Sequence, residues 1–308
     1  MTEAAIEVSG LRKAFPGVQA VAGVDLSIRT GTIFALLGPN GAGKTTTVEI
    51  LEGYQQRDSG EVSVLGFDPA RNQLEMKRRI GIVSQETAAD SFLTVREIMA
   101  MIAGAYPAPR NVDEVIALVG LSDKAGTRVG KLSGGQKRRL DVGLAIVGNP
   151  DLCFLDEPTT GFDPDARQEA WAMIRELKDM GKTVLLTTHY MDEAQNLADE
   201  VAVIAVGRII ATGTPETLGG RAEAASTISF RLPAGTDLPD RFAAEARMTR
   251  RGAMQIIADD PVPLLNDLTG WAMAESVSLT DLTVERPTLE EIYLSLIAND
   301  TAERKEGA

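Results

Sequence analysis

The stretch GPNGAGKTT, residues 38–46, decides the fold of this chain. It fits the pattern Gly-x-x-x-x-Gly-Lys-Ser/Thr through Gly38, Gly43, Lys44 and Thr45. Phosphates need many closely packed donors, and glycines leave the backbone N–H groups uncovered for them. Lys44 would add a positive charge beside the outer phosphates, and the hydroxyl of Thr45 would bind Mg²⁺. The stretch therefore predicts a phosphate-binding loop.

The flanking residues supply the context that this chemistry requires. Thr32–Leu37 is typical of a short buried strand, and Thr45–Leu51 is typical of a helix that Gly53 ends. A helix that opens at the loop directs the positive end of its dipole at the same anion. The order strand, glycine loop, helix argues against a chance match to the pattern.

Composition places the chain among soluble globular proteins. Its 308 residues suffice for one large or two modest domains, and 44% are hydrophobic and 24% charged. No apolar run approaches the roughly 18–20 residues that span a bilayer. The N-terminus, MTEAAIEVSG, predicts no secretory signal. A single cysteine, Cys153, permits no internal disulfide and fits a reducing cytoplasm.

The charge balance argues against a nucleic-acid partner. The formal net charge is −13, whereas proteins that bind nucleic acids freely are usually basic. Two short runs, Lys77–Arg79 and Lys137–Arg139, are the local candidates for a small basic patch.

Hydrophobic periodicity predicts an α/β core with additions. Residues 5–28 alternate as antiparallel strands do, and residues 94–148 have helical periodicity, which indicates a helical insertion between Gln85 and Pro150. Other strands are expected at 61–65, 79–84, 151–155, 183–188, 201–206 and 208–211, and other helices at 164–180 and 191–197.

The character of the chain changes after about Gly220. Strands are expected at 225–232, 254–257 and 276–284, and helices at 264–274 and 287–298. This pattern predicts a small separate α+β domain, followed by a polar tail over residues 301–308.

A pair of carboxylates follows the apolar strand Leu152–Leu155. Ligands bind at the carboxyl ends of parallel strands. Asp156 would hold Mg²⁺, directly or through water, and Glu157 would orient and polarise an attacking water. The alternative is an acidic turn between a strand and a loop.

A second anion site is indicated by Leu132-Ser133-Gly134-Gly135-Gln136. Ser133 suits a helix N-cap, and the two glycines again leave the backbone uncovered. The alternative is an ordinary capped helix. The only histidine, His189, follows the apolar strand 183–188, where its imidazole would reach an outermost phosphate.

Three further residues carry a weaker signal. Gln85 ends a strand before the helical insertion and would contact Mg²⁺ or water. Asp163 precedes Pro164, so it is expected to cap a helix, to contact a facing subunit, or both. Phe15 is either a stacking partner for adenine or a core residue.

These motifs, in this order, resemble those of the ATP-binding cassette ATPases, the motor subunits of ABC transporters. The resemblance covers about Ala5–Pro215. It matches Walker A at Gly38–Thr45, the Q-loop at Gln85, the LSGGQ signature at Leu132–Gln136, Walker B at Leu152–Glu157, the D-loop at Asp163 and the switch histidine at His189.

A finer resemblance is to the daunorubicin-resistance type of exporter ATPase. It rests on Thr159–Pro164, Thr187–Ala194, Gly213–Pro215 and Pro287–Tyr293. Phe162 departs from that pattern, because leucine is commoner there.

The resemblance implies a P-loop NTPase fold with an ABC ATPase core (RecA-like), an antiparallel β subdomain and a helical subdomain at about 89–149. These would form an ATP-binding domain, 1–220, followed by a C-terminal α+β accessory domain, 221–308. ATP and Mg²⁺ are the implied cofactors. The implied catalytic residues are Lys44, Gln85, Glu157 and His189, and the implied metal ligands are Thr45, Gln85 and Asp156. The implied nucleotide contacts are Phe15, Gly38, Pro39, Asn40, Gly41, Ala42, Gly43, Lys44, Thr45, Thr46, Ser133, Gly134, Gly135, Gln136 and Asp163.

The same resemblance implies partners and a location. ATP would lie between the phosphate loop of one subunit and the signature helix of another, in a homodimer or a pair of cassettes. Closure of the two subunits would be passed to a separate integral-membrane permease. This implies that the chain lies in the cytoplasm, peripheral on the inner face of the cell membrane. The implied function is ATP-driven export of an unidentified substrate, with drugs and lipids among the candidates.

The sequence disfavours two other functions. A soluble cassette that remodels ribosomes or DNA is disfavoured by the single cassette, by the absence of a heptad coiled coil between Gln85 and Leu132, and by the acidic charge. A nucleotide-gated binding module without turnover is disfavoured by the presence of Glu157 and His189.

Overall fold

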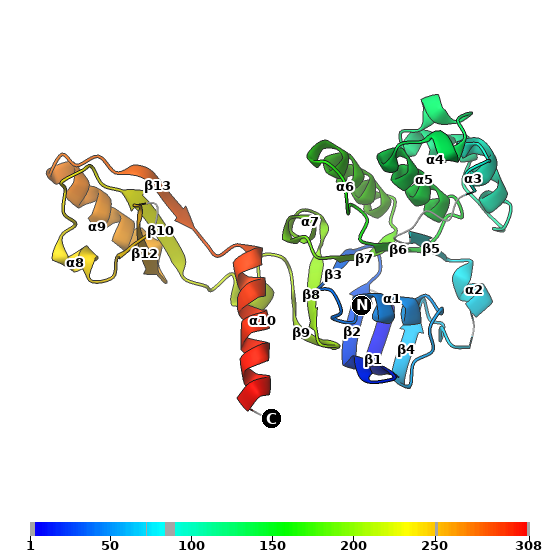
Figure 1. Cartoon of the computed structure of the whole chain (residues 1–308), viewed down its shortest axis with the longest axis horizontal. Helices are drawn as coiled ribbons and strands as arrows, with labels where there is room; N and C mark the ends of the chain where they lie inside the picture. Colours follow the sequence, from blue (N-terminus) through cyan, green and yellow to red (C-terminus); the bar gives the residue numbers. More distant parts are fainter. Residues whose placement is uncertain (1–3, 72, 84–89, 250–251, 307–308) are drawn as a thin grey trace. The chain divides into compact units, whose positions relative to one another are not determined.

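The computed structural model describes residues 4–71, 73–83, 90–249 and 252–306. The chain forms two compact units, Met1–Pro215 and Glu216–Ala308 (Figure 1). The sequence-based division into an ATP-binding domain, 1–220, and an accessory domain, 221–308, stays a prediction.

A six-stranded sheet forms the centre of the first unit, in the order β5-β6-β7-β3-β8-β9. The first five strands of that order are parallel, and β9 is antiparallel to β8. The side chains of the five parallel strands are almost all buried, as expected for strands covered on both faces, whereas those of β9 are exposed or half-buried. The strands are β3 (Ile33–Leu37), β5 (Ile80–Val83), β6 (Leu152–Asp156), β7 (Thr183–Thr188), β8 (Glu200–Ala205) and β9 (Arg208–Gly213).

Three helices follow strands of this sheet directly. They are α1 (Lys44–Leu51) after β3, α6 (Pro164–Asp179) after β6 and α7 (Met191–Leu197) after β7. On α6 the apolar residues recur with helical spacing, and Trp171, Ile174 and Leu177 are buried. Each of these helices therefore begins at the edge of the sheet where the parallel strands end.

A second, antiparallel sheet contains β1 (Ala4–Phe15), β2 (Val18–Arg29) and β4 (Ser59–Val64) in the order β2-β1-β4. Alternate residues such as Ile6, Val8 and Ile28 face a hydrophobic core that also includes Phe34 and Leu36 of β3. The core thus joins the two sheets. A short helix that the sequence did not reveal, α2 (Gln73–Lys77), follows β4.

The helical insertion consists of α3 (Val95–Ala103), α4 (Val112–Leu118), two 3-10 turns (Ser122–Lys124 and Val129–Lys131) and α5 (Gly134–Ile146). Side chains cap its helices: Thr94 forms a capping box with Glu97, and Asn111 accepts from the first turn of α4. Helix α5 packs against β5, so the insertion is anchored to the central sheet.

The second unit has a four-stranded antiparallel sheet in the order β11-β12-β10-β13. Its core contains Phe230, Phe242, Ile256 and Leu268. Its elements are a 3-10 turn (Leu218–Gly220), β10 (Ser226–Arg231), α8 (Asp240–Ala243), β11 (Arg247–Met248), β12 (Met254–Ala258), α9 (Pro261–Ala274), β13 (Thr280–Glu285) and α10 (Leu289–Glu306).

One expectation for this unit was wrong. The predicted polar tail from Thr301 onward is the last part of α10, which continues to Glu306. The sequence there, Ala-Glu-Arg-Lys-Glu, consists of strong helix formers, so the helix continues beyond its apolar residues. Among the described residues, no helix has the length and apolar character that crossing a membrane requires.

The contact between α5 and β5 generates a prediction about stability. A Cβ atom on Gly81 would lie 2.2 Å from the carbonyl oxygen of Ala145, closer than atoms can approach. We expect Gly81→Ala to lower the free energy of unfolding by about 1–3 kcal/mol, as overpacking does. Urea unfolding measures it. The matched control is Gly126→Ala, because a Cβ there meets nothing within 4 Å. Equal stability of the two variants would contradict the prediction.

Candidate active site

The phosphate-binding loop lies between β3 and α1. The N-cap residue of helix α1 is Gly43, which has no side chain to cap the helix. In contrast, Thr94, Asn111, Ser133 and Asp163 cap the helices that follow them. No acidic side chain lies in the first turn of α1 either. Its N–H groups and the positive end of its dipole are therefore left for an external anion.

The glycines of this loop have a second role that the sequence did not show. Gly43 has φ 103°, and a Cβ atom there would lie 2.3 Å from the carbonyl oxygen of Ala20 in β2. A Cβ on Gly38 would lie 2.4 Å from the carbonyl oxygen of Ile204 in β8. Both glycines are thus required for packing as well as for access of phosphate.

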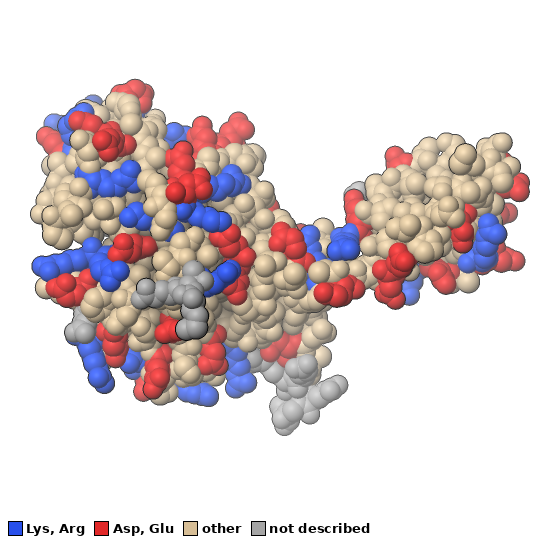
Figure 2. All heavy atoms as spheres, turned by 180° about the vertical axis from the view of Figure 1, so that it is seen from behind, with Lys and Arg blue, Asp and Glu red and all other residues tan. Residues whose placement is uncertain are grey.

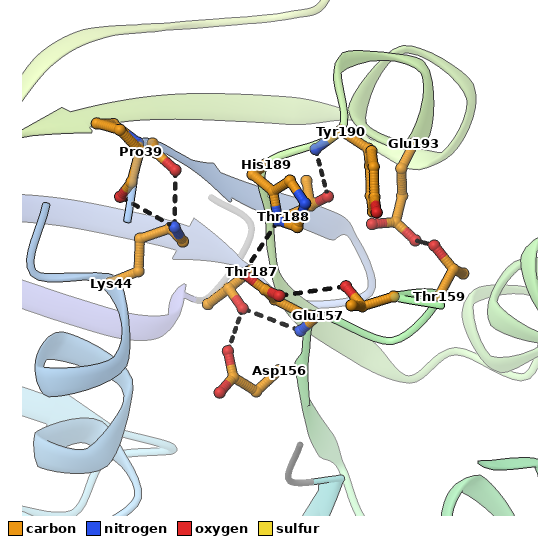
Figure 3. A network of polar contacts seen from close by, with 12 residues as sticks. Pro39, Lys44, Asp156, Glu157, Thr159, Thr187, Thr188, His189, Tyr190 and Glu193 are labelled. Carbon is orange, nitrogen blue, oxygen red and sulfur yellow. Dashed lines mark hydrogen bonds and ion pairs between the residues drawn. The ribbon is translucent and has the colours of Figure 1, made fainter. Parts of the chain in front are cut away.

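Lys44 is held inside the loop (Figure 3). Its Nζ donates to the carbonyl oxygens of Gly38, at 2.7 Å, and Pro39, at 3.2 Å. Burial lowers the pKa of Lys44, while the nearby carboxylates of Glu157 and Asp156 oppose that shift. Its ammonium group is therefore already positioned on the loop, where it has few solvent contacts to lose when an anion binds.

The carboxyl end of β6 is joined to β7 through one hydroxyl group. Thr187 Oγ1 donates to the carboxylate of Asp156 and accepts from the backbone N–H of Glu157 at 3.1 Å. Asp156 and Thr187 are also partners in the register of the parallel pair β6–β7. The two acidic residues are therefore fixed relative to the strand that leads to His189.

Glu157 is held at both carboxylate oxygens. Oε1 lies 3.1 Å from Nδ1 of His189, and Oε2 accepts from the hydroxyl of Thr160 at 3.1 Å (Figure 3). Its backbone has φ 46°, an unusual value for a residue with a side chain. A carboxylate with fixed orientation next to an imidazole is suited to orient a water molecule and accept its proton.

The turn that follows Glu157 is anchored in the protein interior. Thr159 Oγ1 donates to Glu193 Oε1 at 2.8 Å, and Nε1 of Trp171 lies 3.4 Å from the same oxygen. Glu193 is fully buried, and burial raises its pKa, which favours the neutral acid. This contact ties the turn to both α6 and α7.

Thr45 and Asp156 fit a magnesium site. Both line the same groove, which has a volume of about 780 Å³, and both present oxygen atoms, the ligands that Mg²⁺ prefers. Within the described part of the chain, no cluster of three or more His, Cys, Asp or Glu side chains is arranged to hold a metal. Thr45 and Asp156 supply two oxygen ligands, and oxygens of phosphate and water would complete the coordination of Mg²⁺.

Glu52 lies in the same groove, at the end of α1. It is only 6% exposed. Burial, together with the negative charges of Asp156 and Glu49, raises the pKa of Glu52 to about 8.

The signature segment lies at a different hollow. Ser133 and Gln136 form a reciprocal capping box at the start of α5. Gly134 and Gly135 line a hollow of about 390 Å³ together with Arg138 and residues 157 and 160–162. None of the phosphate-loop residues lines it. Within one chain, the two predicted anion sites therefore do not line a common hollow, although Glu157 lies beside the signature segment.

The remaining predicted residues have mixed outcomes. Asp163 caps α6 by accepting from the N–H of Ala166 at 2.8 Å, and its contact with a facing subunit stays a prediction. Phe15 is 39% exposed, which excludes the core alternative, and Nζ of Lys13 lies 5.3 Å from its ring centroid. Gln85 lies outside the described residues.

Sequence reasoning missed the residues that support this site, namely Thr160, Thr187, Glu193 and Arg138. Thr187 and Glu193 lie within the segment 187–194, which was matched to relatives without a role for either residue. Arg138 was grouped with a basic run, but its guanidinium donates to the carbonyl oxygens of Asp156 and Pro158.

The two basic runs are not free cationic patches. Arg78 and Arg79 pair with Glu75 and Asp151, and Arg139 pairs with Glu169. On the face that Figure 2 shows, Lys and Arg side chains alternate with Asp and Glu.

A phosphate loop, a carboxylate pair and a histidine at one edge of a mostly parallel sheet define a P-loop nucleotide-hydrolysing protein. The family model described as "ABC transporter" matches residues 21–160, and a second, "ABC transporter domain-containing protein-like, C-terminal domain", matches residues 226–288. Together with the relatives below, these matches show that the chain belongs to the ATP-binding cassette family, as the motifs predicted. Members of this family are ATPases.

Curated relatives match nearly the whole chain. The daunorubicin resistance ATP-binding protein DrrA3 of Streptomyces coeruleorubidus is 35% identical over 97% of this chain and 98% of its own. The daunorubicin/doxorubicin resistance ATP-binding protein DrrA of Streptomyces peucetius is 37% identical over 97% and 94%. The Nod factor export ATP-binding protein I of Burkholderia thailandensis is 36% identical over 97% and 99%.

Solved structures confirm the predicted fold class. The ADP conformation of MJ1267, an ATP-binding cassette of an ABC transporter, has a TM-score of 0.62 and 27% identity, and the match covers 70% of this chain and 92% of that one. CbiO1 from Clostridium perfringens, part of the ABC transporter complex CbiONQ, has a TM-score of 0.64 and 28% identity, with coverage of 70% and 90%.

Glu52 generates a prediction about pH. The pKa of Glu52 is raised from 4.5 to about 8 in the folded protein. Between these two pH values the folded protein therefore keeps a proton on Glu52 that the unfolded chain has lost. Its contribution to stability is therefore lost as the pH rises from 4.5 to 8. We expect Glu52→Gln to reduce the loss of stability between pH 5 and pH 8 by on the order of 2–4 kcal/mol.

Urea unfolding of the nucleotide-free protein in EDTA, at both pH values, measures this effect. Glu176→Gln, a change at an exposed position on α6, is the control. The same pH dependence in Glu52→Gln and the wild type would contradict the prediction.

Proposed function

We propose that this chain is the Mg²⁺-dependent ATP-hydrolysing motor of an exporter, acting on a separate integral-membrane permease. The observation that carries the proposal is the convergence of Lys44, Asp156, Glu157 and His189 at one edge of the central sheet. The names of the relatives support export, because the Streptomyces proteins are named for drug resistance and the Burkholderia protein for Nod factor export. The transported substrate is not assigned.

The chemistry follows from the positions of the side chains. The uncapped end of α1 and Lys44 bind the phosphates of ATP and stabilise the charge that develops on the transferred phosphoryl group. Mg²⁺, held by Asp156 and the Thr45 hydroxyl, would neutralise phosphate charge. Glu157 accepts a hydrogen bond from the attacking water and orients it in line with the outermost phosphorus. His189, which contacts Glu157, donates to the outermost phosphate.

The separation of the two anion sites supports a composite site. We infer that ATP bound on the phosphate loop of one subunit is covered by Ser133, Gly134, Gly135 and Gln136 of a facing subunit, in a homodimer or paired cassettes. ATP then favours the closed pair, because it binds the closed form better than the open one. Hydrolysis of ATP removes the nucleotide that holds the two subunits together. Phe15 stacks on adenine, and Asp163 lies at the subunit boundary.

We also propose a location for the motor and roles for its parts. The motor works in the cytoplasm, peripheral on the inner face of the cell membrane, where ATP is available. The helical insertion, with Gln85 at its start, transmits closure to the permease. Residues 1–220 form the ATP-binding domain, and residues 221–308 form an accessory domain. No nucleic-acid partner is proposed.

The first test is Glu157→Gln. We expect ATP binding to be retained, hydrolysis to fall by about 10²-fold or more, and the closed dimer to accumulate, because the amide no longer accepts the proton of the water. Phosphate release and size-exclusion chromatography with Mg·ATP measure these effects. Glu176→Gln is the control. Hydrolysis close to that of the wild type would refute the assignment of Glu157.

The second test is Lys44→Ala. We expect the affinity for ATP to fall by about 10–100-fold, since a charge-assisted hydrogen bond contributes about 1.5–3 kcal/mol. Titration calorimetry with ATP measures it. Lys182→Ala is the control. Lys182 directly precedes β7, at the end of the strand that is distant from the phosphate loop, and its Nζ donates to Asn149. Unchanged affinity in Lys44→Ala would refute the role of this lysine.

A further inference from the structure

We propose that Arg138 is a positioning residue that holds the backbone of Glu157 in its catalytic geometry and links it to the signature helix α5. The inference rests on the proposed hydrolysis of ATP and adds to it a residue from a different part of the fold.

The guanidinium of Arg138 binds three successive carbonyl groups. Its Nη2 donates to the carbonyl oxygens of Asp156, at 2.7 Å, and Glu157, at 3.1 Å. Its Nε donates to the carbonyl oxygen of Pro158 at 3.1 Å. A planar guanidinium presents its donors in a fixed geometry, so these bonds define the path of the turn as well as its distance from α5.

The backbone at this turn requires such a constraint. Glu157 has φ 46°, which costs free energy for a residue with a Cβ atom and persists only where the surroundings enforce it. Its N–H group is bound by the Thr187 hydroxyl and lies 3.1 Å from the Thr187 carbonyl oxygen. Its carbonyl group is bound by Arg138. Both backbone polar groups of Glu157 are therefore held, one from β7 and the other from α5.

The electrostatic surroundings also suit an arginine. Burial lowers the pKa of Arg138, and the nearby carboxylates of Asp141, Asp156 and Glu157 oppose that shift. A lysine would bring the same charge, but its ammonium is compact and strongly hydrated and does not match three carbonyls in a row. The site thus uses the shape of the guanidinium as well as its charge.

Arg138 connects the signature end of α5 to the turn that carries Glu157. Ser133 caps this helix, and Arg138 lies in its second turn, about 7.5 Å further along the axis at about 1.5 Å per residue. A displacement of the signature end of α5 therefore pulls on the carbonyl groups of the catalytic turn. Loss of Arg138 frees the Glu157 backbone to relax, and its carboxylate moves away from the attacking water.

The test compares Arg138→Met and Arg138→Lys with the wild type. We expect both to lower kcat for Mg·ATP hydrolysis by at least about tenfold and to leave KM and the ATP dissociation constant within about threefold. The matched control is Arg175→Met, which also removes a guanidinium bound to a backbone carbonyl, that of Asn196, but far along α6 from the turn. Arg138→Lys keeps the charge and the aliphatic stem, so it tests the shape of the group if Arg138→Met fails to fold.

A double-mutant cycle with Glu157→Gln separates positioning from general structural damage. Single-turnover hydrolysis of ATP labelled at the γ-phosphate measures the residual rates. If Arg138 acts through Glu157, Arg138→Met will cost less than about twofold in the Glu157→Gln background. Equal losses in both backgrounds, a kcat unchanged by both Arg138 variants, or parallel losses of kcat and nucleotide affinity would overturn the inference. A wild type that does not hydrolyse Mg·ATP would instead overturn the proposed function.

Discussion

The register of the parallel strands is the constraint on which the site depends. Leu37 pairs with Thr188 and Asp156 pairs with Thr187, so β3, β6 and β7 end at the same level. Whatever residues follow these strands must meet at one edge of the sheet. The phosphate loop follows β3, Glu157 follows β6 and His189 follows β7. The site is therefore a consequence of backbone pairing, and the side chains supply the chemistry.

Hydroxyl groups hold this edge together. Thr187 connects Asp156 to the backbone of Glu157, Thr160 binds the Glu157 carboxylate, and Thr159 reaches the buried Glu193. Threonine suits this role because its hydroxyl both donates and accepts, and Thr159 and Thr187 are buried. The result is a carboxylate with little freedom, on a backbone that would not adopt φ 46° by itself. Such preorganisation is what orientation of a single water molecule requires.

Much of the fold and part of the site were predictable from the sequence. The motif residues Lys44, Asp156, Glu157 and His189 lie on the expected loop and strand ends, because short apolar strands and glycine punctuation have strong local signals. The boundaries of α10 and the presence of α2 were not predictable with the same ease, because helix propensity in polar segments is a weak signal. The sequence places Arg138 only in a basic run, because it does not show which backbone carbonyl groups a guanidinium will contact in the folded chain.

The sequence by itself determined the class of chemistry. A glycine loop with Lys44 and Thr45 predicts phosphate binding, and the Asp156–Glu157 pair after an apolar strand predicts a metal ligand and a base. Only the tertiary structure decided how these groups are held: Ala20 and Ile204 carbonyl groups exclude a side chain at Gly43 and Gly38, and Arg138 comes from another subdomain to fix the Glu157 backbone. The physical reason is that a motif gives the residue types that lie close together in the sequence. Steric exclusion and hydrogen bonds between distant segments form only when the chain folds.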